Sequence, residues 1–512
     1  VETSPVRVHR QVPCKGDLSE VGRKIAIGSC LQGCQQQSHL TKTENVIPHW
    51  PAVGFPPDRV LKSTPSQDCP RGSLRLFVCR VVCSRRMPEG SMKYFTDEQL
   101  AREIRPLPDV AMEALEAGQI ERLYHLLNEM SVGHRELDAL GLQWISRMFG
   151  KIRSDIGEGF LDEVLDGSAS FLMAPYAEGF RKEDEKGTIL EFATVWKNSV
   201  CTNLVPLGED DDQVILSLSP CGTGGRLLLE EWPRLLPEFF SPCSDGTPIY
   251  CRGCKALQQA FNRAVGETVW TTRISETLPG TCEMRFSKRS TKGRRLFETD
   301  EFYQIGKTRS RQALDRLLAG SFDIKDLIRN QHREWLPWHD LFVQWATCVL
   351  SAVYREKGAE YLDAFLKQTY DPAFSFLYTI SDALDDVGVF RLFARIWNYH
   401  MATFRVKEEE DRFVFTLDPC GSGGRLYRAD MHNGQFRYGS GIPCLMENPA
   451  NINFNRKDFP IYCTHCASSN RNQFEGGPLV FVIDGLAQKD PASPCVHYLY
   501  KKGAKREVPP AI

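Results

Sequence analysis

The cysteines of this 512-residue chain recur in two sets of four that share one order. In each set a lone cysteine is followed after 22 or 24 residues by a second, and then by a Cys-x-x-Cys pair. A Cys-x-x-Cys turn places two thiolates on one cation, and the two remote cysteines can complete a tetrahedron. The interval between the second and third cysteine changes from 8 to 19 residues while the thiols stay. We therefore expect one metal site per set, with the ligands Cys221, Cys243, Cys251, Cys254 and Cys420, Cys444, Cys463, Cys466.

Three kinds of chemistry suit four clustered thiols. Zinc is the first expectation, because four thiolates form the closed tetrahedral site that zinc takes in structural positions. An iron-sulfur cluster takes the same ligands and is the alternative. Disulfides or plain buried thiols come third, since no secretory signal is visible and cytosolic thiols stay reduced. These features favour a cytoplasmic protein.

Each lone cysteine begins a Pro-Cys-Gly-x-Gly-Gly-Arg turn. Its backbone N–H groups can approach an anion closely, and the arginine can clamp a carboxylate or phosphate. The alternative is a knuckle whose glycines permit a tight turn around a metal thiolate, with the arginine packing outward. The turn is neither a P-loop nor a dinucleotide fingerprint. The candidate ligand-binding residues are Gly224, Gly225, Arg226 and Gly423, Gly424, Arg425.

Histidines beside these motifs are candidates for acid-base work. His465 lies inside the second Cys-x-x-Cys pair, where the first has Gly253. It could ligate the metal or act as an acid or base, or it is simply a loop histidine. His339 and Asp340 begin a predicted helix and could form an acid-base pair, or they cap and pack that helix.

The two cysteine sets belong to an internal repeat. Gln143-Trp144 and Gln344-Trp345 begin matching apolar helical patterns upstream, and a fifth cysteine, Cys282 or Cys495, closes each copy. We expect these last two cysteines to be buried core residues first and redox nucleophiles second. The repeat predicts copies over 92–290 and 312–505, packed about a pseudo-twofold axis.

The periodicity of each copy predicts a helical half followed by a small antiparallel sheet that carries the cysteine knuckle, an α+β fold. A capping box of Thr96 and Gln99 begins the first helix. The three-to-four spacing of apolar residues predicts helices near 97–130, 136–166, 311–331 and 339–369. Alternating apolar residues predict strands over 213–218, 413–417, 283–286 and 496–500.

The composition is that of an ordinary globular protein. It has 63 Lys and Arg against 65 Asp and Glu, a net charge of −2 and 42% hydrophobic residues. Collagen-like and wholly disordered chains are excluded, and no apolar run approaches the roughly 18 residues that span a bilayer. A nucleic-acid partner is not expected. Residues 285–311 form a basic stretch. We predict its part over 291–311 to be a solvated linker, with a nucleic-acid or acidic-ligand surface as the alternative.

The two ends of the chain differ from its body. Residues 1–91 hold 13 Lys and Arg against 7 Asp and Glu, and they contain six cysteines at no metal-site spacing. The first methionines are Met87 and Met92. We therefore expect 1–91 to be upstream sequence translated in frame, or else a disordered or targeting arm. Residues 506–512 are predicted to be a short tail.

The order of a helical region, a strand, a cysteine-bearing segment and the closing Cys282-Glu-Met-Arg-Phe strand resembles two families of bacterial small-molecule domains. These are the L-2-amino-thiazoline-4-carboxylate hydrolase-like and 4-vinyl reductase families. The resemblance covers the latter half of each copy. A hydrolase-like relationship implies a small heterocyclic or acidic substrate, and no catalytic residue is carried over from it.

Two functions suit these features. The first is a bacterial metalloprotein that binds, or binds and hydrolyses, a small anionic molecule held by Arg226 and Arg425. The second is a non-enzymatic sensor or assembly module in which zinc only holds the loops. An iron-sulfur cluster would instead indicate a redox protein.

Overall fold

A computed structural model describes residues 93–504 apart from 183, 200–201, 230–242, 244–245, 276–279, 290, 426–444, 477–480 and 485–493. The predicted tails 1–91 and 506–512 lie outside the described residues. The described chain is mostly helical with small antiparallel sheets, which confirms the α+β class. Within it, no helix is long and apolar enough to cross a membrane.

Two four-stranded antiparallel sheets have the same strand order, β1-β2-β4-β3 and β5-β6-β10-β9. All four predicted strands are present, as β2, β6, β4 and β10. The two sheets consist of β1 (Leu204–Glu209), β2 (Gln213–Leu218), β3 (Trp270–Ile274), β4 (Cys282–Ser287), β5 (Phe404–Glu408), β6 (Arg412–Leu417), β9 (Phe481–Asp484) and β10 (Cys495–Tyr500). A further pair joins β7 (Leu445–Met446) to β8 (Phe459–Pro460).

The long helical pattern of each copy is interrupted at a glycine. Gly157, with φ 121°, separates α6 (Arg135–Asp155) from α7 (Glu158–Arg181). Gly358, with φ 81°, interrupts α16 (Gln331–Ala383). Glycine adopts a positive φ readily, and a chain in that conformation leaves the helical path. The predicted continuous helices over 136–166 and 339–369 are therefore wrong at these two points, because the apolar spacing continues on both sides of the break.

The first predicted helix is also divided. The range 97–130 contains α3 (Asp97–Glu103), α4 (Leu107–Glu116) and α5 (Ile120–Val132), because Pro106 precedes α4 and Gly118 takes a positive φ. The capping box is confirmed: Thr96 Oγ1 accepts a hydrogen bond from Gln99 N at 3.2 Å, and Gln99 Oε1 accepts one from Thr96 N at 2.9 Å. In the second copy α14 (Arg309–Leu318) and α15 (Lys325–Arg329) replace the helix predicted over 311–331.

The segment at the start of the first copy, and the segment just before the second, each pack on the sheet of the other copy. The backbone N–H groups of Tyr94 and Phe95 donate to the Glu408 carboxylate at 2.8 and 2.9 Å. Those of residues 296–297 donate to the Glu209 carboxylate in the same manner. Glu408 belongs to the second sheet and Glu209 to the first. The two copies therefore exchange equivalent segments.

This exchange changes the interpretation of residues 291–311. The range holds α13 (Thr299–Gln304), which contacts β1, and the start of α14. Phe297 and Phe302 are both buried. The stretch predicted to be a solvated linker is thus folded against the first sheet, because its few apolar residues are enough to anchor it.

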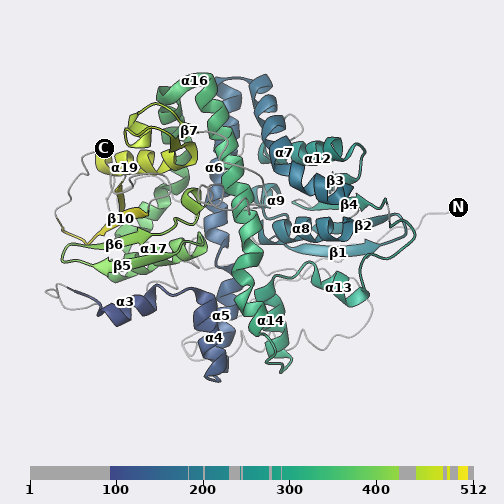
Figure 1. Ribbon diagram of the computed structural model, residues 1–512, viewed down its shortest axis with the longest axis horizontal. Coiled ribbons are helices and arrows are strands. Elements are labelled where there is room, and N and C mark those ends of the chain that lie inside the picture. The colour runs from purple at the N-terminus through teal and green to yellow at the C-terminus, as the bar shows by residue number, and fades with distance from the viewer. Residues whose placement is uncertain are drawn as a thin grey trace, which may run out of the picture. The chain divides into compact units, whose positions relative to one another are not determined.

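The helices α6 and α16 pack against each other between the two sheets (Figure 1). The Trp144 ring of α6 lies 6.1 Å from the Tyr462 ring and 5.4 Å from the His465 ring, both in the second copy. The Trp345 ring of α16 lies 5.6 Å from the Tyr250 ring in the first copy. Each tryptophan of the Gln-Trp pairs therefore packs on the cysteine region of the opposite copy.

Candidate thiol clusters and an aromatic cavity

Four cysteines gather in the first copy, and the fourth comes from a strand. Cys282 begins β4, and its thiol hydrogen-bonds to that of Cys221. Cys251 and Cys254 lie one turn apart in α12 (Tyr250–Val265). A Cβ on Gly224 would collide with Cys251 Sγ, so this glycine lets the turn approach the thiol. All three other thiols lie near enough to raise the pKa of Cys282.

The second copy repeats this cluster. Cys495 begins β10, and its thiol hydrogen-bonds to that of Cys420. Cys463 and Cys466 flank the start of α19 (Thr464–Gly476), and both raise the pKa of Cys495. A Cβ on Gly423 would lie 2.7 Å from Cys463 Sγ. The same four positions therefore meet in both copies.

The second metal ligand predicted for each set is Cys243 or Cys444, and Cys243 is not among the thiols that gather in its cluster. Cys243 lies in a loop, where its backbone N–H donates to Thr247 O at 2.8 Å. The thiols that raise the pKa of Cys254 are Cys251 and Cys221, and Cys243 is not one of them. Cys444 lies outside the described residues. Cys282, which we predicted to be a core residue, holds the position in the cluster that we predicted for Cys243.

The glycine-rich turns direct their backbone N–H groups at their own cysteine. A hydrogen bond from Cys282, together with N–H groups of Thr223 and Gly225, lowers the pKa of Cys221 to about 6. The equivalent donors, led by Cys495, lower the pKa of Cys420 to about 6. Donors that bind the charged form of a thiol stabilise it. This geometry favours the knuckle over the anion cradle.

The clusters are not assembled metal sites as they stand. Across the described ranges, no three histidine, cysteine, aspartate or glutamate side chains are arranged to hold a metal ion. None of the ten described cysteines of the core forms a disulfide.

Arg425 is held in an ion pair. Its guanidinium bonds to both carboxylate oxygens of Asp340, with a distance of 3.1 Å to Oδ2, and its Nε donates to Gly421 O at 2.8 Å. Arg425 Nη2 also lies 3.2 Å from His339 Nδ1. Burial opposes the charge on Asp340, but His339 and Arg425 hold its pKa below the ordinary value. Arg226 is buried in α9 (Gly224–Leu229). An anion reaching Arg425 would have to compete with Asp340, and the anchor role of both arginines stays a prediction.

His339 continues this network to a residue that the sequence analysis did not select. His339 Nε2 lies 3.2 Å from His400 Nδ1. His400 caps the end of α17 (Asp386–Tyr399). Burial lowers the pKa of His400 well below that of a free histidine, so the imidazole is neutral.

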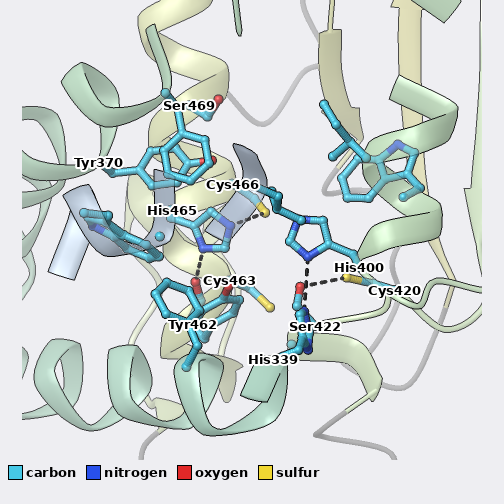
Figure 2. Close-up of a pocket in the computed structure, with 18 of the residues that line it drawn as sticks. His339, Tyr370, His400, Cys420, Ser422, Tyr462, Cys463, His465, Cys466 and Ser469 are labelled. Carbon is cyan, nitrogen blue, oxygen red and sulfur yellow. Dashed lines mark hydrogen bonds between the residues drawn. The ribbon is translucent and has the colours of Figure 1, made fainter. Parts of the chain in front are cut away.

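A cavity of about 130 Å³ lies beside the second thiol cluster (Figure 2). Its wall includes the thiols of Cys420, Cys463, Cys466 and Cys495 and the rings of His339, His400, His465 and His497. Trp144 from the first copy and several aromatic residues of the second form most of the rest. The structure thus brings the candidates His339 and His465 together at one cavity, with Asp340 directly behind His339.

His465 is bonded through both ring nitrogens. Its Nδ1 bonds to Tyr462 O, and its Nε2 lies 3.5 Å from Cys466 Sγ. Burial lowers the pKa of His465 to about 4. These bonds fix the ring at the cavity wall next to the thiols (Figure 2).

None of the four histidines at this cavity has a histidine counterpart in the first copy. A Cβ on Gly222 would collide with Ser199 O, and one on Gly421 with His400 O, so these positions are equivalent. In the sheets Leu216 pairs with Met284, and Phe415 with His497. The corresponding pairs are His339 and Asp138, His400 and Ser199, His465 and Gly253, and His497 and Met284. Comparing the two copies position by position would have identified His400 and His497 from the sequence.

Stability is expected to fall as the pH falls below about 6.5, because buried histidines resist protonation. His134 stacks on Trp335 with ring centroids 4.1 Å apart, and burial lowers its pKa well below the ordinary value. The unfolded chain therefore binds more protons than the folded one below this pH, and each such histidine costs about 1.4 kcal/mol per pH unit. His134→Phe keeps a stacked ring. It should reduce the loss of unfolding free energy by about 1.4 kcal/mol per pH unit below about pH 6.5.

Urea unfolding near pH 7, 6 and 5 measures the slope of the unfolding free energy against pH. His125 is exposed, and His125→Phe is the matched control that should leave the slope unchanged. An unaltered slope in His134→Phe would show that His134 takes up protons in the folded state.

The comparisons with known proteins give no relative. No protein-family model, curated protein or solved structure matches this chain.

Proposed function

We propose that this chain is a metal-binding protein with one tetrathiolate site in each copy, and that zinc is the metal. The ligands are Cys221, Cys251, Cys254, Cys282 and Cys420, Cys463, Cys466, Cys495. The observation that carries the proposal is the convergence of the same four cysteines twice, from a turn, a helix and a strand. Four-cysteine sites are typical of structural zinc.

The donor set suits a soft divalent cation. The hydrogen-bonded thiol pairs Cys221 with Cys282 and Cys420 with Cys495 already join two ligands in each copy. Cys251 and Cys463 lie against the glycines of the turn. A bound cation would draw the remaining thiols inward and deprotonate them, since metal binding to cysteine releases protons. The metal would tie the turn to the helix and to the closing strand.

Elemental analysis of the full chain, purified without oxygen, tests this proposal. We expect about two zinc ions per chain, one for each tetrathiolate site. Cys282→Ser and Cys495→Ser should each lose one ion, because each removes a ligand from one cluster. Cys243→Ser is the matched control and should keep both.

Three outcomes would overturn parts of the proposal. Loss of an ion in Cys243→Ser with full occupancy in Cys282→Ser would restore the loop cysteine as the ligand. Iron with a broad visible absorption band would indicate an iron-sulfur protein instead. A chain without metal would show that the thiols only pack together.

A further inference from the structure

His465 is oriented as a metal ligand beside the second thiol cluster. Its Nδ1 bonds to Tyr462 O, and a carbonyl oxygen only accepts, so the proton lies on Nδ1. In the neutral ring the lone pair then lies on Nε2, which accepts the hydrogen bond from the Cys466 thiol (Figure 2). A metal-bound histidine usually donates its other ring N–H to a carbonyl or carboxylate in this manner. The His465 ring is therefore fixed with a lone pair directed at the thiols.

The distance from His465 to the nearest thiol suits two ligands of one ion. His465 Nε2 lies 3.5 Å from Cys466 Sγ. A tetrahedral zinc ion, with Zn–S of about 2.3 Å and Zn–N of about 2.0–2.1 Å, holds a sulfur and a nitrogen ligand about 3.5 Å apart. An ion bound by Cys466 would therefore lie within reach of Nε2. The second cluster thus has five donors, one more than zinc takes in a closed site.

The first copy has no side chain at the equivalent position. Gly253 stands there, and a Cβ on Gly253 would collide with the Trp345 ring. In the second copy His465 is accommodated beside the equivalent tryptophan, Trp144, with ring centroids 5.4 Å apart. The first cluster is therefore limited to its four thiols at this point, whereas the second has a nitrogen donor in addition.

Cys466 is the thiol that His465 is placed to replace. Both side chains come from the start of α19, and the Tyr462 carbonyl holds the ring there. Cys495 belongs instead to β10, where its thiol bonds to Cys420. Exchange of Cys466 for an imidazole also removes one thiolate charge from a buried site, and buried charge is costly. A short shift of the ion would move it from Cys466 to His465 while the other three thiols stay bound.

We propose that His465 is an exchangeable ligand of the second metal site, which takes the place of Cys466 on the ion through Nε2. This inference rests on the proposed tetrathiolate sites and refines the second of them. Cys466 lines the cavity of about 130 Å³, so a thiol released from the ion faces that space. The second copy can thus keep its metal when Cys466 is removed or modified. The first copy has no such replacement for the equivalent thiol, Cys254.

The zinc content of full-length variants tests the exchange, after dialysis against a chelator at a concentration that leaves both wild-type ions bound. We expect Cys466→Ala to retain about two ions per chain, and Cys254→Ala, the matched control in the first copy, to retain about one. Cys466→Ala combined with His465→Gly should also retain about one, because no donor then replaces the thiol. His465→Gly alone should retain both, since the four thiols remain. X-ray absorption at the zinc edge should show an imidazole in Cys466→Ala.

The outcomes separate this inference from the metal function beneath it. A wild-type chain without zinc would overturn both. A wild-type chain with both ions, together with a Cys466→Ala chain that has lost one, would refute the exchange alone. Retention of both ions in the double variant would also refute it, because a group other than His465 would then fill the vacated position. If Cys466→Ala fails to fold, Cys466→Ser keeps a side chain of nearly the same size, and the absence of an imidazole from its zinc spectrum would refute the exchange.

Discussion

Glu408→Gln is expected to destabilise the folded chain by about 3–5 kcal/mol, the usual cost of breaking a buried ion pair. Lys501 Nζ lies 2.8 Å from Glu408 Oε1, and the two side chains are only 8% and 2% exposed. The amide would leave the Lys501 charge buried without its counter-charge. The same carboxylate also accepts the N–H groups of Tyr94 and Phe95. The substitution should therefore also release the segment that the first copy lends to the second sheet.

Urea unfolding measures the loss of stability, and limited proteolysis after residue 93 detects the released segment. Glu410→Gln is the matched control, because Glu410 is exposed two residues further along. It should change stability by less than about 0.5 kcal/mol. Lys288 Nζ pairs with Glu209 at 2.7 Å at the equivalent place of the first copy. Glu209→Gln should therefore cause a loss of stability similar to that of Glu408→Gln. A Glu408→Gln chain as stable as Glu410→Gln would mean that Lys501 reaches solvent.

Gly253→Ala is expected to cost about 1–3 kcal/mol, because the new methyl group would overpack the crossing of the two copies. Gly253 lies in α12 against the Trp345 ring, and a Cβ there would also lie 3.3 Å from Phe149. Alanine favours a helix over glycine by about 0.5–1 kcal/mol, so the loss must come from packing. Thermal or urea unfolding gives the free-energy difference.

A glycine-to-alanine substitution at Gly167 should change stability in the opposite direction. Gly167 is exposed in α7, and a Cβ there would meet no atom within 4 Å. Gly167→Ala should stabilise by about 0.5–1 kcal/mol. Trp345→Phe should recover part of the loss in Gly253→Ala, because contacting residues couple in a double-mutant cycle. Additive effects would contradict the contact between Gly253 and Trp345.

Local spacing was enough to predict several elements of this chain. The capping box at Thr96 and the strand ending at Leu218 were predicted correctly, since their signals lie within a few residues. The repeated turn also placed Cys221 and Cys420 at equivalent positions of two similar sheets. The glycine breaks at Gly157 and Gly358 were missed, because apolar spacing alone does not report φ.

The sequence by itself determined the α+β class, the four strands β2, β4, β6 and β10, and the Cys-x-x-Cys pairs. Only the tertiary structure decided that Cys282 and Cys495 face the lone cysteines. The strand pairings β2 with β4 and β6 with β10 bring them there, and these pairings join residues more than 60 positions apart. It also decided that Trp144 lines a cavity of the opposite copy. Periodicity reports which face of an element is buried. Which other element covers that face depends on packing across the whole chain, and here that packing exchanges helices between the copies.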